Sequence, residues 1–410
     1  MSNYRGFAME YATHPFALLR APHRIAFLAG LVAALMLMAG WSAELIARHT
    51  GTTLTPTVPS LFAHGFLMLY GIFPLFMCGF LFTAGPKWLD AAPPPPWAYL
   101  GVPVAMLGGL LVWTVGLSLG PLWLRCGLAL YSIGFTGLIA SFVRCLLSSQ
   151  AAERRHAFVV AAAFLLGLAG LGAAWIWLLD NDYRAWTLMR DLALWGFLLP
   201  VFLTICHRML PFFSANVIAG YRPWRPWTLL YAMLGGSLAH GIVSQLQIPL
   251  WPIDAVLTLL LGYTSWRWRL VASLNVKLLA MLHLAFAWLP IAFALYTLQG
   301  LLAGQGIDAF GYAPLHAITV GFFLTMLIAF VSRVSLGHSG RPLAASTLLW
   351  RLYLTTQALA ALRVTTDLTP AAWHPSLYVL AAIGCLLVLA AWGRGLLSSY
   401  WRPRADGRPG

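Results

Sequence analysis

The sequence predicts an all-α, polytopic integral membrane protein with about 12 transmembrane helices in a single domain, residues 1–410. Two observations lead to this prediction. Charged residues make up only 9% of the chain and hydrophobic residues 60%, and apolar stretches long enough to cross a bilayer recur throughout. A surface of that composition is stable in lipid and not in water. Secreted, disordered and nucleic-acid-binding classes are therefore excluded, and the net charge of +14 is assigned to membrane topology.

The predicted spans are apolar stretches of about 17 to 25 residues, bounded by Pro, Gly or charged residues. The eighth is short and the eleventh comparatively polar, so ten or eleven crossings are the alternative. The first twenty residues carry charges and no apolar run, which predicts a retained first helix and no cleaved signal peptide. The five cysteines lie in or beside apolar segments, so no disulfide framework is expected. The spans cover residues 24–46, 61–85, 98–118, 121–147, 157–179, 186–210, 227–247, 250–265, 275–299, 314–333, 344–363 and 375–397.

The basic residues predict the orientation of the bundle. With a cytoplasmic N-terminus, 19 of the 25 Lys and Arg residues fall on the cytoplasmic side and 5 outside, with Arg351 inside the eleventh span. This asymmetry is the one that the positive-inside rule describes. Both termini are therefore predicted to be cytoplasmic. The outer side receives several acids: Asp180, Asp182, Asp308 and Asp367.

Ionisable side chains inside hydrocarbon are costly and mark functional sites, and histidine is the most frequent of them here. Of the 11 histidines, six lie in loops or at helix ends, where water satisfies them: His14, His23, His49, His156, His338 and His374. Five remain within the predicted spans: His64, His207, His240, His283 and His316.

His64 lies near the start of the second span and His316 near the start of the tenth, and both spans enter from the outside. Two neutral imidazoles at matched depth on separate helices can bind one haem iron from opposite faces of the porphyrin. We therefore expect His64 and His316 to be haem ligands. Small residues beside them are expected to let the macrocycle lie against the backbone: Gly65, Gly71, Ala317 and Gly321.

The other three histidines have two interpretations each. His240 and His283 are either ligands of a second cofactor or partners in interhelical hydrogen bonds. His207 lies between Cys206 and Met209 near the end of the sixth span, a combination of donors that copper accepts, or it belongs to an ordinary helix end. Three acids near outer helix ends either deliver protons to an outer cofactor or lie at the interface: Glu44, Asp191 and Asp254.

Five segments resemble the NnrS family. They are LFAHGFLMLYGIFPLFMCGFLFTAGPKW at 61–88, HRMLPFFS at 207–214, LHLAFAWLP at 282–290, HAITVGFF at 316–323 and SRVSLGHSGR at 332–341. The resemblance implies a twelve-helix protein of the bacterial inner membrane that contains haem and copper and is tied to denitrification and resistance to nitric oxide.

One departure from the family pattern bears on the metal. The family often has H-x-H-E-M in the second helix, whereas this chain has His64 followed by Phe66 and Leu67 at the positions of the second His and the Glu. This favours His64 as a haem ligand over a copper site that needs three or four donors. The loop around His338, between Arg333 and Arg341, matches the family's Gly-His-Ser/Thr-Gly-Arg signature and is either part of a second site near His207 and His283 or a structural turn.

The leading functional hypothesis is a haem-binding inner-membrane protein, with b-type haem and with copper as a further candidate, that binds or transforms nitric oxide or related nitrogen oxides. Whether it is an enzyme stays open; if it is, it is a haem-dependent oxidoreductase. A transporter or metal-handling permease that uses the intramembrane histidines is the first alternative, and a haem sensor or assembly factor without turnover is the second. The expected partners are haem, nitric oxide and the lipid bilayer, with no nucleic acid.

Overall fold

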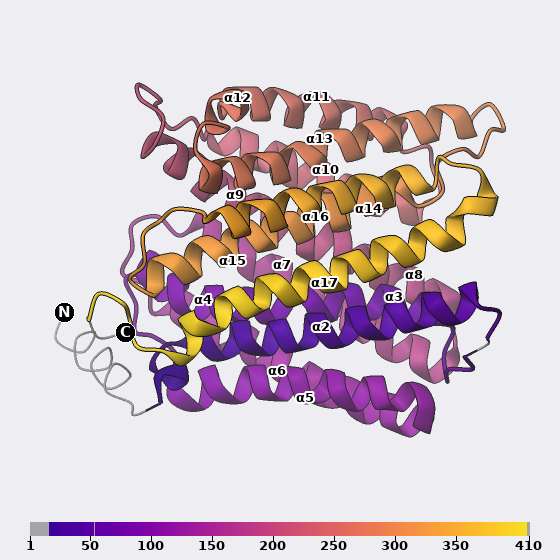
Figure 1. Ribbon diagram of the computed structural model, residues 1–410, viewed down its shortest axis with the longest axis horizontal. Coiled ribbons are helices and arrows are strands. Elements are labelled where there is room, and N and C mark those ends of the chain that lie inside the picture. Colours follow the sequence, from indigo (N-terminus) through magenta and orange to yellow (C-terminus); the bar gives the residue numbers. More distant parts are fainter. Residues whose placement is uncertain (1–15, 53, 408–410) are drawn as a thin grey trace.

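The computed structural model describes residues 16–52 and 54–407, and within them every regular element is helical. Long helical rods lie side by side and alternate in direction (Figure 1). The elements are η1 Ala17–Arg20, α2 Pro22–His49, α3 Ser60–Phe66, η2 Leu67–Ile72, α4 Phe73–Leu89, α5 Pro96–Leu119, α6 Pro121–Leu147, α7 Arg155–Asp180, α8 Tyr183–Asp191, η3 Leu192–Leu198, α9 Leu199–Ala215, α10 Trp227–Gln245, α11 Trp251–Arg267, α12 Leu270–Ser273, α13 Lys277–Ala303, α14 Ala313–His316, η4 Ala317–Leu324, α15 Thr325–His338, α16 Thr347–Thr366, η5 Ala371–Trp373 and α17 His374–Trp401.

The predicted membrane character is confirmed. Among the described residues, 9 helical segments are long and apolar enough to cross a membrane. The three other predicted spans form α10, α11 and α16, so each predicted span contains a helix. The count of about 12 crossings and the cytoplasmic location of the termini stay predictions. The predicted domain, 1–410, includes residues 1–15, 53 and 408–410, which lie outside the described part of the chain.

Because neighbouring rods alternate in direction, each end of the bundle holds the first residues of some helices and the last residues of others. We call the end where α17 begins and α2 ends the distal end, and the end where α17 finishes the proximal end (Figure 1). The distal end corresponds to the side that the sequence predicts to be outside. Local sequence explains where several rods begin there: Pro121 opens α6, and Asp182 caps α8 by accepting a hydrogen bond from the Arg184 backbone at 2.8 Å.

Three rods are interrupted by a π-helix near their distal ends: α3–η2–α4, α8–η3–α9 and α14–η4–α15. They are also the most enclosed, with 83%, 83% and 72% of their most apolar stretches buried against at most 61% in the other six candidate spans. Proline accounts for two of the interruptions. Pro74 and Pro200 follow η2 and η3, and a proline cannot donate to the preceding turn and sterically disrupts it.

Carbonyl oxygens that lack a backbone N–H donor for this reason accept hydrogen bonds from side chains of other helices. The Tyr131 hydroxyl of α6 donates to the Tyr70 carbonyl at 2.5 Å, and the Ser237 hydroxyl of α10 donates to the Trp195 carbonyl at 2.8 Å. Such partners are required because hydrocarbon offers no water to an open carbonyl. The π-helices are therefore held by tertiary contacts.

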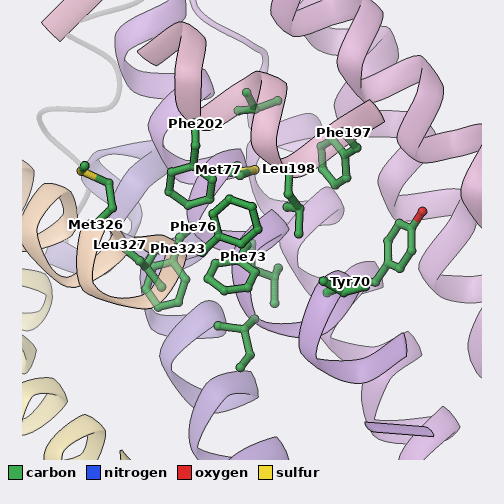
Figure 2. Close-up of a cluster of buried hydrophobic side chains, with 14 of the residues drawn as sticks. Tyr70, Phe73, Phe76, Met77, Phe197, Leu198, Phe202, Phe323, Met326 and Leu327 are labelled. Carbon is green, nitrogen blue, oxygen red and sulfur yellow. The ribbon is translucent and has the colours of Figure 1, made fainter. Parts of the chain in front are cut away.

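The three rods meet in an aromatic cluster at the centre of the bundle. Phe73 of α4 lies 5.5 Å from Phe323 of η4 and 5.9 Å from Phe202 of α9, measured between ring centroids. Phe202 and Phe323 stack at 4.8 Å (Figure 2). This packing fixes the relative positions of the distal segments that carry His64 and His316.

Candidate functional site

His64 and His316 occupy corresponding places at the distal end. His64 lies in α3, directly before η2, and His316 is the last residue of α14, directly before η4. Both imidazoles therefore lie at the distal end of the bundle, on separate rods. π-helical insertions are frequent at functional sites, since they change the direction of side chains relative to the rest of the helix.

Hydrogen bonding leaves a ring nitrogen available on each histidine. Nδ1 of His316 lies 2.9 Å from the Tyr312 carbonyl, so it carries the proton and Nε2 keeps its lone pair. The His64 ring stacks on Trp41 at 3.8 Å, and its Nδ1 is buried without a hydrogen-bond partner. Imidazoles that bind metals are oriented in this manner, with one nitrogen held by the protein and the other unprotonated. His316 satisfies that description fully, whereas His64 is held by stacking.

Arg363 supplies positive charge to the same place. Its guanidinium interacts electrostatically with both His64 and His316. Its Nη1 donates to Asp367 at 2.9 Å, and its guanidinium lies over the Tyr378 ring at 4.5 Å. The side chain is 15% exposed. A guanidinium held by a carboxylate and a ring is well placed to bind a second anion, such as a carboxylate of a ligand.

Asp367 connects this arginine to His316. Its Oδ2 accepts a hydrogen bond from the Tyr312 backbone at 3.0 Å, and the carbonyl of Tyr312 in turn accepts from His316. The histidine, Tyr312, Asp367 and Arg363 therefore form one hydrogen-bonded chain. In the sequence, Arg363 is one of the five basic residues assigned to the outer side, and Asp367 is one of the acids assigned there. Arg363 lies in the last turn of α16 and Asp367 directly follows that helix, and no local sequence pattern there indicates contact with His316 through Tyr312.

The residues at the distal end fit a haem. Two imidazoles come from separate helices with a ring nitrogen available on each, the unpartnered Nδ1 of His64 lies in the interior, and Arg363 lies at the same end of the bundle. A copper site fits less well. Within the residues that the structure describes, no group of three or more His, Cys, Asp or Glu could hold a metal ion.

The expectation about small residues is wrong. A Cβ at Gly71 would overlap Leu37, one at Gly321 would lie 2.5 Å from the Trp288 ring, and one at Gly65 would lie 3.1 Å from Trp186. These glycines allow bulky side chains of other helices to approach the backbone. Ala317 is likewise fully buried. The backbone at these four positions is therefore covered by protein, because close helix packing is the usual role of small residues in membrane bundles.

His240 and His283 both have protein partners. Nδ1 of His240 lies 2.7 Å from Oδ1 of Asp254, and the two residues are 2% and 0% exposed. Nε2 of His283 lies 2.9 Å from the Ser214 hydroxyl, which joins α13 to α9 in the proximal half. The geometry of His283 is that of an interhelical hydrogen bond. Their roles as cofactor ligands stay predictions.

Both ring nitrogens of His207 are hydrogen-bonded. Nε2 lies 3.1 Å from the Pro226 carbonyl, and Nδ1 lies 3.0 Å from Nε2 of His156. The carbonyl fixes the proton on Nε2 of His207, so His156 donates to its Nδ1. Copper binding at His207 would require breaking one of these bonds. His156, which the sequence placed at a helix end, is 3% exposed and its Nδ1 has no partner.

The loop that carries the family signature is a turn that anchors the C-terminal segment. Gly340 has a φ of 70°, and the Arg341 guanidinium donates to Ser399 at 3.2 Å. The Ala405 backbone donates to the Ser339 carbonyl at 2.8 Å. These contacts support the structural interpretation of the signature. The loop lies at the proximal end, away from His64 and His316.

Comparison with known proteins identifies the family. The family model described as NnrS protein matches residues 17–404. No curated protein matches the chain. Since the family model covers nearly the whole chain and all the helices described above, this protein belongs to the NnrS family.

Proposed function

We propose that this chain is a haem-binding protein of the bacterial inner membrane that binds or transforms nitric oxide or related nitrogen oxides, in denitrification or in resistance to nitrosative stress. The observation that carries the proposal is that His64 and His316 lie with Arg363 at the distal end, each histidine on a rod interrupted by a π-helix and each with a ring nitrogen available. Membership of the NnrS family supports it by association with nitric oxide.

In this proposal His64 and His316 would hold the haem through their imidazoles, and Arg363 would bind a carboxylate of the same group. A b-type haem held there supplies a redox-active iron that binds diatomic nitrogen oxides. The protein holds the two imidazoles unequally. Tyr312 fixes the orientation of His316 and raises its basicity through the 2.9 Å hydrogen bond, whereas Nδ1 of His64 has no partner. His64 is therefore the less firmly held of the two imidazoles.

The test is the haem content of the purified chain and two variants. The wild-type protein is expected to show a Soret band and a pyridine haemochrome at about one haem per chain. His64→Ala and His316→Ala should each lose most of the bound haem, whereas His49→Ala, an exposed histidine at the same end, should retain it. A colourless, well-folded wild-type preparation would refute the haem site and favour the transporter alternative.

Nitric oxide then distinguishes binding from catalysis. Added to the reduced protein, it should shift the Soret band once if the protein only binds it, and a gas electrode should record continuous consumption if the protein turns it over with an electron donor. Exogenous imidazole provides a check on His64: it should restore haem binding to His64→Gly, because the cavity left by the ring admits a free imidazole. Failure of imidazole in a folded variant would contradict ligation by His64.

A further inference from the structure

A second group of buried polar side chains lies at the distal end, on α8, α10, α11 and α13. At its centre is the pair His240 and Asp254, whose atoms Nδ1 and Oδ1 are 2.7 Å apart. Both residues are almost completely enclosed, with exposures of 2% and 0%. Oδ2 of Asp254 is buried and has no hydrogen-bond partner. A buried carboxylate oxygen without a partner is costly in an apolar region, so it requires a ligand.

The surroundings connect this pair to the surface. Asp191 of α8, which is 4% exposed, accepts a hydrogen bond from Arg190 at 2.8 Å and another from the exposed Gln245 at 2.6 Å. The half-buried Tyr296 of α13 lies within electrostatic range of Asp254, Asp191 and Arg190. Asp191 and the buried pair thus lie near the same tyrosine, whose ring centroid is 5.0 Å from that of His240, and Gln245 extends this group of side chains to the distal surface.

Charge balance among these side chains requires one dissociable proton on the pair of His240 and Asp254. Arg190 and Asp191 neutralise each other. His240 and Asp254 together are neutral only when they hold one dissociable proton, either on the imidazole or on the carboxyl group. Without that proton, a net negative charge remains in an apolar part of the protein, where ionised groups are strongly disfavoured.

Aromatic rings close the pair off from bulk water. The Trp195 ring lies 3.8 Å from the His240 ring, and Tyr296 and Phe293 lie at 5.0 and 6.0 Å, measured between centroids. Trp195 belongs to η3, and the π-helix there places its ring over the imidazole. An acid–base pair enclosed in this way exchanges a proton through neighbouring polar side chains more readily than with bulk water.

We propose that His240 and Asp254 form a proton-exchange site that receives its proton from the distal surface through Asp191. The ligand is a single proton: it arrives at Oδ2 of Asp254 or on His240, and the same number of protons leaves by the same route, with no change of oxidation state. The site is distinct from the proposed haem site and does not depend on it. The competing interpretation is an ion pair that only holds α10 against α11 and never exchanges its proton.

Infrared difference spectroscopy of the purified full chain after a pH jump between about 5 and 8 tests the proposal. The wild-type protein should give a carbonyl band of a protonated carboxyl group together with imidazole bands. Asp254→Asn should lose the carbonyl band, and His240→Gln should lose the imidazole bands. Asp308→Asn, an exposed acid at the same end, should leave both unchanged. An unaltered spectrum in Asp254→Asn would overturn the proposal.

Two further measurements distinguish failure of this proposal from misfolding of a variant and from failure of the proposed haem site. Labelling the wild-type protein with ¹³C-aspartate should shift the carbonyl band, and this measurement does not depend on the folding of a variant. If no carbonyl band shifts with the label, the site is overturned. Asp191→Asn should slow the appearance of the signal on the order of 100-fold, because a proton-transfer group is removed. An unchanged rate would overturn the route. The spectrum of His316→Ala should match the wild type, which keeps this result independent of haem.

Discussion

Replacement of Arg363 by leucine tests whether the distal end binds the carboxylates of a haem. The guanidinium lies at the same end of the bundle as His64 and His316 and is already oriented by Asp367 at 2.9 Å. Because Arg363 is held in place before a ligand arrives, little side-chain entropy is lost on binding. Its contribution is then that of a hydrogen bond to a charged group, about 1.5–3 kcal/mol. This corresponds to roughly 10- to 150-fold weaker haem binding in Arg363→Leu.

The assay is titration of haem-depleted protein in nanodiscs with haemin, followed at the Soret band. Arg363→Lys should fall between the wild type and Arg363→Leu, because a lysine keeps the charge but loses the planar pair of donors. Arg184→Leu, an exposed arginine at the same end, serves as the matched control and should bind haem as the wild type does. Equal affinity of Arg363→Leu and the control would refute the role of Arg363.

Two further predictions concern the π-helix that follows His64. Gly71→Ala adds a methyl group that overlaps Leu37, so the variant should be less stable by about 1–3 kcal/mol in thermal unfolding in detergent. Tyr131→Phe removes the 2.5 Å hydrogen bond to the Tyr70 carbonyl, for which Pro74 supplies no backbone donor. It should cost about 1–3 kcal/mol by the same measurement, the penalty for a buried carbonyl left without a partner.

Each of these variants has a matched control. A Cβ at Gly172 meets no atom within 4 Å, so Gly172→Ala should leave stability unchanged or slightly raise it. Tyr231 is 50% exposed, and Tyr231→Phe should be neutral. If Gly71→Ala is as stable as Gly172→Ala, the contact with Leu37 does not restrict the helix. If Tyr131→Phe is as stable as Tyr231→Phe, water or another donor satisfies the Tyr70 carbonyl.

The sequence alone determined the helical membrane class and the approximate position of each span. For example, the predicted span at 314–333 lies within the rod from Ala313 to His338, and the short eighth span became Trp251–Arg267. Hydropathy along the chain carries this information, because the bilayer fixes the length of an apolar helix. The backbone N–H and C=O groups in the bilayer must also form their hydrogen bonds within the protein, which favours helices. The sequence also placed His64 and His316 at one depth, since depth depends only on distance from the helix start.

Only the tertiary structure decided what these side chains contact. Arg363 and Asp367 were outer charges in the sequence, and the fold connects them to His316 through Tyr312. His240 had two interpretations until Asp254 was found beside it at 2.7 Å. The physical reason is that hydropathy describes one helix at a time. It records neither the rotation of a helix about its axis nor its neighbour, and both are set by packing between rods.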